Sequence, residues 1–155
     1  MDLSRLLPQN HTLIKLAPSS REDMFRALSQ PLVDTGIVTD ADIFITDLEA
    51  REQQITTVIG NGVAIPHART DVASRLGLSV GILEQGTSMQ FANDPEVEEI
   101  NLLFLIAIPT FAPASHLPLL QHLANFIRYE KKISKLLKSK TPAAAAKYLH
   151  SFKTK

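Results

Sequence analysis

The sequence has no cysteine among its 155 residues, which excludes disulfides, thiolate metal sites and cysteine nucleophiles. It also has no excess of charge, because sixteen basic side chains balance sixteen acidic ones. Nucleic-acid binders usually carry a basic excess, so we expect no nucleic acid among the partners. The longest apolar run, "LLFLIAI", is too short to cross a bilayer, and the first residues show no signal peptide. We therefore expect a cytoplasmic protein without membrane insertion.

Three catalytic signatures are missing as well. No Gly-x-x-x-x-Gly-Lys-[Ser/Thr] sequence is present, so nucleotide-dependent phosphoryl transfer has no support. Neither the Gly-x-Ser-x-Gly elbow of a serine hydrolase nor the His-Glu-x-x-His pair of a zinc enzyme occurs. With 45% apolar and 21% charged residues, the composition is that of a globular protein. The length suits one hydrophobic core, so we expect a single domain over residues 1–155.

Helical and strand patterns alternate along the chain. Apolar residues at helical spacing, together with helix start and end signals, predict helices over 17–36, 38–52, 115–129, 131–139 and 141–152. Short apolar runs over 76–83 and 100–108 are bounded by turn residues, as is typical of fully buried strands, although a buried helix would look alike. This alternation favours an α/β layer fold.

Several residues mark where these helices should begin and end. Ser19 stands at capping-box spacing before a glutamate, and Gly36 should end the same helix. Pro31 should kink or shorten it, because proline removes a backbone hydrogen bond. The second helix should begin at Thr39, with acidic residues in its first turn, and the last helix should be capped by Thr141.

The stretch "TTVIGNGVAIPHART", residues 56–70, presents a histidine directly after a proline. Pro66 fixes its own φ and forces Ile65 into an extended conformation, so the backbone that enters His67 has little freedom. A neutral imidazole, with a pKa near ~6.5, is a nucleophile at neutral pH and can carry a covalent intermediate. The alternative is a histidine that only caps a turn in a loop.

Two further side chains suit an anion. Arg51, near the end of the second predicted helix, offers a planar fork of donors that matches phosphate oxygens. His116 opens the helix predicted over 115–129, where unpaired N–H groups and the positive end of the dipole favour an anion. Ser115 is the expected N-cap. Taken alone, Arg51 also fits an ordinary surface arginine, and His116 fits a histidine satisfied at a helix start.

With Arg51, "GNGVAIPHA" and "SHLPLLQHL" in view, residues 5–150 resemble enzyme IIA of the fructose–mannitol group of the bacterial phosphoenolpyruvate-dependent phosphotransferase system. That group includes the nitrogen-regulatory IIA proteins. The most specific part is "LEAREQQITTVIGNGVAIPHA", which joins an arginine–glutamate pair, a threonine and a glycine-rich lead into Ala-Ile-Pro-His. The resemblance implies a single domain with a mixed β-sheet flanked by helices on both faces, and neither a metal ion nor an organic cofactor.

The resemblance also implies a role for each candidate residue. His67 would accept phosphate from the phosphocarrier protein HPr and pass it to a IIB component of a sugar permease. His116 would hydrogen-bond His67 or the phosphoryl oxygens, and Arg51 would steady the phosphate. Thr57 and Ser115 are further expected neighbours of the phosphate. Phosphoryl transfer needs mainly positioning and charge balance, which such residues supply.

A phosphohistidine must also be shielded from water. Val63, Ile65 and Phe111 are candidates for a dry rim, which would serve as a docking patch for HPr as well. The alternative is that all three belong to the core.

Two functions fit these residues. In the first, the protein is a transferase component that passes phosphate through His67 toward sugar uptake. In the second, it is a regulatory protein of the nitrogen-related type, in which phosphorylation changes binding to a transporter or kinase. The sequence favours sugar transport modestly, and it identifies no sugar.

Overall fold

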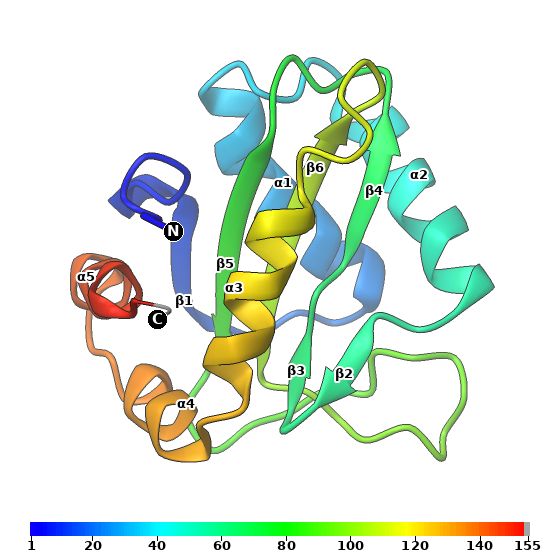
Figure 1. Cartoon of the computed structure of the whole chain (residues 1–155). Helices are drawn as coiled ribbons and strands as arrows, with labels where there is room; N and C mark the ends of the chain where they lie inside the picture. Colours follow the sequence, from blue (N-terminus) through cyan, green and yellow to red (C-terminus); the bar gives the residue numbers. More distant parts are fainter. Residues whose placement is uncertain (154–155) are drawn as a thin grey trace.

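The computed structural model of the chain describes residues 1–153 and shows a mixed β-sheet between two layers of helices (Figure 1). The predicted α/β fold, with helices on both faces of a mixed sheet, is confirmed. No helix within residues 1–153 has the length and apolar character that crossing a membrane requires. Along the chain the elements are η1 (Gln9–His11), β1 (Thr12–Leu16), α1 (Arg21–Asp34), α2 (Ala41–Gln54), β2 (Val58–Gly60), β3 (Val63–Ala64), β4 (His67–Thr70), β5 (Gly77–Leu83), β6 (Leu102–Pro109), α3 (Leu117–Ile127), α4 (Glu130–Leu137) and α5 (Pro142–Ser151).

Strand β6 is the centre of the sheet. It pairs antiparallel with β5 and parallel with both β3 and β4, while β1 pairs parallel with β5 and β2 antiparallel with β3. Every residue of β5 and of β6 is buried, which explains why both strands read as continuous apolar runs in the sequence. The strands predicted over 76–83 and 100–108 correspond to β5 and β6.

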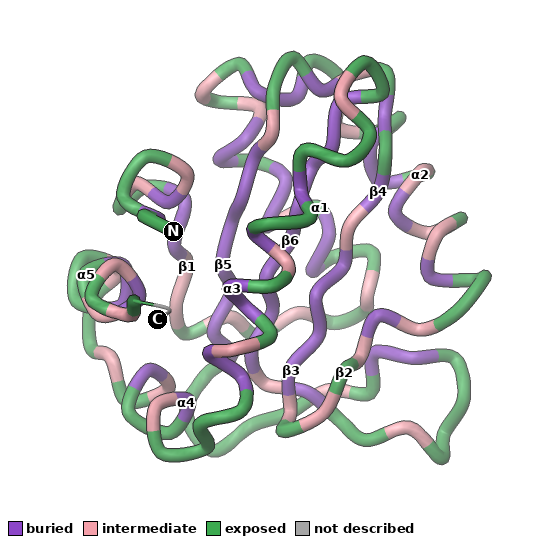
Figure 2. The backbone as a smooth tube through the Cα atoms, in the orientation of Figure 1, coloured by how far each residue is buried: buried purple, intermediate pink, exposed green. Residues whose placement is uncertain are grey.

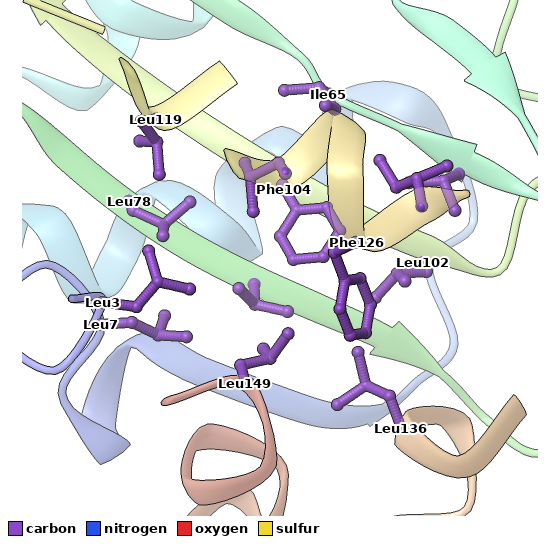
Figure 3. Close-up of a cluster of buried hydrophobic side chains, with 14 of the residues drawn as sticks. Leu3, Leu7, Ile65, Leu78, Leu102, Phe104, Leu119, Phe126, Leu136 and Leu149 are labelled. Carbon is purple, nitrogen blue, oxygen red and sulfur yellow. The ribbon is translucent and has the colours of Figure 1, made fainter. Parts of the chain in front are cut away.

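Successive residues of β6 supply two separate hydrophobic cores, because the side chains of a strand alternate between its faces. Phe104 and Ile106 pack with residues of α3, α4 and α5, whereas Leu103 and Leu105 pack with residues of α1 and α2. Figure 2 shows the burial of the central strands. Figure 3 shows the first core, in which the rings of Phe104 and Phe126 pack edge to face with centroids 6.4 Å apart. Strand β6 is therefore fixed from both sides.

Two helices begin later than predicted. The cap of α1 lies one residue beyond Ser19, and α2 begins at Ala41, two residues beyond Thr39. The N-cap of α1 is Ser20, whose hydroxyl accepts a hydrogen bond from the N–H of the third helical residue, and not Ser19. The N-cap of α2 is Asp40, whose carboxylate does the same, so Thr39 lies before the helix. In both cases the residue directly before the first helical residue has the extended backbone that a cap needs. Thr141 caps α5 as predicted.

Helix α1 continues through Pro31 to Asp34, so this proline does not end it. The carbonyl of Pro31 accepts hydrogen bonds from both the N–H and the hydroxyl of Thr35. Gly36 follows with a φ of 75°, the left-handed conformation that ends many helices, as predicted.

We expect Phe104→Ala to lower the free energy of unfolding by about 3–5 kcal/mol, because it opens a cavity in a fully buried position of β6. The matched control is Phe111→Ala, since Phe111 is 75% exposed and its loss should change stability by less than about 0.5 kcal/mol. Urea denaturation of both variants measures the difference. Equal costs at the two positions would contradict this account of the core.

Candidate active site

The residues that lead into His67 interrupt the stretch of chain that pairs with one side of β6. Strands β3 and β4 pair with the same edge of β6, Ala64 opposite Leu103 and His67 opposite Ile106, so the register is unchanged across the interruption. Between the two strands, the N–H of Ile65 does not pair with β6 but donates to the carbonyl of Thr57 at 2.9 Å. Pro66 has no N–H, but its carbonyl accepts from Ile106 at 2.9 Å. The backbone is therefore held on both sides directly before His67.

The ring of His67 is half-buried and fixed in one tautomer. Its Nδ1 lies 2.7 Å from the carbonyl oxygen of Ile65. Because a carbonyl only accepts, the neutral ring must carry its proton on Nδ1, which leaves the lone pair of Nε2 free. Burial lowers the pKa of His67, and the nearby charges of Arg51 and Arg69 lower it further, although the bond to Ile65 acts in the opposite direction. At neutral pH the ring is thus an uncharged nucleophile.

His116 lies beside His67, as the sequence predicted for two residues of one site. The two ring centroids are 5.8 Å apart and the ring planes are inclined by 30°. His116 is buried, and its Nδ1 has no hydrogen-bond partner in the described chain. Burial is the main cause that lowers its pKa, followed by the charges of His67 and Arg69. The site therefore contains two neutral imidazoles in contact distance.

The start of α3 differs from the prediction. The N-cap position is held by His116 and not by Ser115, and within residues 1–153 no side chain caps this helix. Ser115 is exposed and lies in the preceding turn, where its N–H donates to the carbonyl of Ala112 at 3.1 Å. The prediction of Ser115 as the cap was wrong because this tight turn brings His116, one residue further on, to the helix boundary.

Arg51 lies in the last turn of α2, the helix that packs against β4. Its Nη1 donates to the carbonyl of Ile55 at 2.6 Å, just beyond the end of the helix. Its charge acts on the ring of His67. Arg51 is therefore placed near His67 by the docking of α2 on β4, although sixteen residues separate the two in sequence.

Thr57 is buried and its hydroxyl is engaged by a carboxylate. The hydroxyl lies 2.6 Å from Oε1 of Glu52, and the N–H of Thr57 donates to the same carboxylate at 3.0 and 3.2 Å. Sequence reasoning gave no separate role to Glu52, although it stands next to Arg51. The pair closes the turn between α2 and β2, and this turn supplies the carbonyl that binds Ile65.

Arg69 is a second residue that sequence reasoning missed. It follows His67 by two positions on β4, and the side chains of such residues lie on the same face of a strand. Its Nε donates to the carbonyl of Pro113 at 2.9 Å, in the loop that carries His116. Period-two spacing from His67 in "HART" was the signal that could have found it.

The three residues proposed for a dry rim separate into two groups. Val63 and Ile65 are buried on the α3 side of the sheet, so these two residues belong to the core and not to a rim. Phe111 is exposed in the loop before α3, and Leu117, also more than half exposed, is the first residue of that helix.

Within residues 1–153, no group of three or more histidine, aspartate or glutamate side chains is arranged to hold a metal ion.

The chain is similar to known proteins over most of its length. The family model described as "Phosphoenolpyruvate-dependent sugar phosphotransferase system, EIIA 2" matches residues 5–152. Among curated proteins, the chain is 29% identical over 140 residues to the fructose-specific EIIA component of Haloferax volcanii, covering 90% of this chain and 89% of that protein.

Solved structures share the fold. The nitrogen regulatory protein IIA-Ntr from Neisseria meningitidis superposes with a TM-score of 0.83 at 22% identity, covering 95% of this chain and 98% of that one. Enzyme IIAMTL from Escherichia coli, solved in complex with phosphorylated enzyme IIBMTL, has a TM-score of 0.76 at 17% identity, with 92% and 96% covered.

We expect NMR titration to give pKa values below about 6.5 for both His67 and His116, because burial disfavours their charged forms. Both rings should stay neutral as the pH falls through the range in which an exposed histidine takes up its proton. Long-range 1H–15N spectra should show the proton of His67 on Nδ1. A ring of His67 protonated on Nε2 at neutral pH would contradict the assigned tautomer.

We expect Thr57→Val to lower the free energy of unfolding by about 1–3 kcal/mol, because it leaves the buried carboxylate of Glu52 without its hydroxyl donor. Thr57→Ser keeps the hydroxyl and serves as the matched control, with a clearly smaller loss. Urea denaturation at neutral pH compares the two. If valine were tolerated as well as serine, the bond to Glu52 would be of no structural value.

Proposed function

The chain belongs to the EIIA 2 family of the phosphoenolpyruvate-dependent sugar phosphotransferase system, a family of phosphoryl carriers, and on this basis we propose that His67 is the residue that carries the phosphoryl group. His67 accepts the group from phospho-HPr in the cytoplasm and passes it to a IIB component of a sugar permease. The observation that supports this most directly is the hydrogen bond from Nδ1 of His67 to the Ile65 carbonyl, because it leaves Nε2 as the nucleophile.

The proposed step exchanges one P–N bond for another. The lone pair of Nε2 attacks phosphorus, an Nε2–P bond forms, and the bond from phosphorus to the donor's imidazole nitrogen breaks, with its electron pair leaving on that nitrogen. The proton on Nδ1 of His67 stays in place, and the Ile65 carbonyl stabilises the positive charge that develops on the ring. Passing the group on reverses these changes at Nε2. The neutral form of the ring at neutral pH is what makes the attack available.

Arg51 and His116 supply the surroundings of the transferred group in this proposal. The charge of Arg51, which already acts on the His67 ring, balances that of the phosphoryl oxygens. The ring of His116 lies next to that of His67, and its buried Nδ1 has no hydrogen-bond partner in the described chain. A hydrogen bond to the phosphoryl group would satisfy this nitrogen.

Thr57 acts indirectly, since it binds Glu52 and shapes the turn that holds Ile65. Ser115, exposed just before His116, remains a proposed neighbour of the phosphate.

The proposed docking surface consists of Phe111 and Leu117. Both are exposed apolar side chains, and they flank His116 in sequence on either side. Exposed apolar groups next to a reactive ring suit a transient partner, because docking buries them and excludes water from the phosphohistidine. HPr and the IIB component would use this surface in turn.

We expect the protein to gain one phosphoryl group, visible by intact mass, when it is mixed with phosphoenolpyruvate, enzyme I and HPr. His67→Ala should lose the gain completely, whereas His150→Ala, at the outer end of α5, should keep it. NMR of the labelled imidazole should place the phosphate on Nε2. His116→Ala should still accept phosphate but pass it on about 10²-fold more slowly, because positioning and not the nucleophile is lost.

The outcome of onward transfer separates the two functions. Transfer to a IIB protein encoded next to this chain supports sugar transport. Stable phosphorylation without transfer to any such IIB protein supports the regulatory alternative, in which a phosphate of about two negative charges changes partner binding. Equal phosphorylation of the His67→Ala variant would place the site elsewhere.

A further inference from the structure

The loop between β6 and α3 is held next to β4 by two contacts. The Nε of Arg69 donates to the carbonyl of Pro113 at 2.9 Å, and the hydroxyl of Thr110 donates to the carboxylate of Asp71 at 2.8 Å. Figure 1 shows this loop beside the end of β4. Arg69 therefore contacts the segment that carries His116 while its own backbone lies two residues from His67.

The side chain of Arg69 is only partly used by this contact. Nε makes the bond to Pro113, and within residues 1–153 its two terminal nitrogens have no hydrogen bond or ion pair. The residue is exposed at the surface that also presents His67. Two donor nitrogens of a planar guanidinium are therefore available on the face of β4 that carries His67.

Arg69 is also the arginine whose charge reaches both histidines. It lowers the pKa of His67 and that of His116, whereas Arg51 acts on His67 and is not among the causes for His116. The two arginines belong to different elements, Arg51 to the last turn of α2 and Arg69 to β4.

The charges around His67 need a second cation if a phosphoryl group is to be bound. Arg51, Arg69 and Glu52 are the charged groups that act on the ring. A phosphoryl group brings about two negative charges at neutral pH, and Glu52 adds a third. The phosphorylated ring keeps its proton on Nδ1 and therefore carries one positive charge. With Arg51, this leaves one negative charge uncompensated, and Arg69 balances it.

We propose that Arg69 is a second phosphate-binding cation of this site, which holds the loop of His116 through its Nε and binds phosphoryl oxygens through its terminal nitrogens. This rests on the proposed function of His67. The arrangement makes the position of His116 and the binding of phosphate depend on the same guanidinium.

The experiment compares Arg69→Gln, Arg69→Lys and the control Arg128→Gln at the far end of α3. Glutamine keeps an N–H donor for Pro113 but no charge, whereas lysine keeps the charge without the planar fork. His67 is phosphorylated chemically with phosphoramidate, so that labelling does not depend on HPr. 31P NMR then follows the pH at which the phosphoryl dianion takes up its first proton, and transfer from phospho-HPr is timed separately.

We expect Arg69→Gln to raise the pKa of the phosphoryl group, because the cation that favours its dianion is gone, and to slow transfer from phospho-HPr about 10- to 100-fold. Arg69→Lys should restore part of both effects, and Arg128→Gln should match the unmodified protein. If Arg69 only fastens the loop, the phosphoryl pKa will not change and glutamine will perform as well as lysine, which overturns the proposal. Failure of phospho-HPr to label the unmodified protein would instead overturn the proposed function, while the 31P titration still decides the role of Arg69.

Discussion

The hydrogen bond between Nδ1 of His67 and the carbonyl of Ile65 is the interaction on which the site depends. It exists because Pro66 interrupts the pairing of β3 and β4 with β6 without shifting its register, and the carbonyl of Ile65 turns toward the ring two residues further on. A regular strand would direct successive carbonyls to its neighbours and leave the ring free to rotate. By fixing the proton on one nitrogen, this bond decides which nitrogen can react.

The rest of the molecule holds that short segment still. Strand β6 is packed on both faces and pairs with β4. The backbone of His67 is therefore held in place by a strand that both cores fix. On the other side, the buried pair of Glu52 and Thr57 shapes the turn whose carbonyl binds Ile65. A buried carboxylate is tolerated there because its oxygens receive the N–H and the hydroxyl of Thr57.

The electrostatics of the site favour phosphate without charging the histidines. Burial and two arginines lower the pKa of His67, which keeps the nucleophile neutral, and the same arginines attract an anion. A positively charged imidazole would bind phosphate but could not attack it. The site therefore separates the two tasks, placing permanent charge on guanidinium groups and the reactive lone pair on an uncharged ring.

Much of this could be predicted from the sequence, because local rules set it: the buried runs of β5 and β6, the helices, and the stiff backbone before His67. Local signals failed at Ser115, where a tight turn decided the start of the helix. They left open whether Val63 and Ile65 line a rim or the core, and the packing of the sheet placed both in the core. The sequence by itself determined that a rigidly presented histidine would exist. Only the tertiary structure decided what surrounds it, because the loop of His116 meets β4 through contacts between residues some forty positions apart.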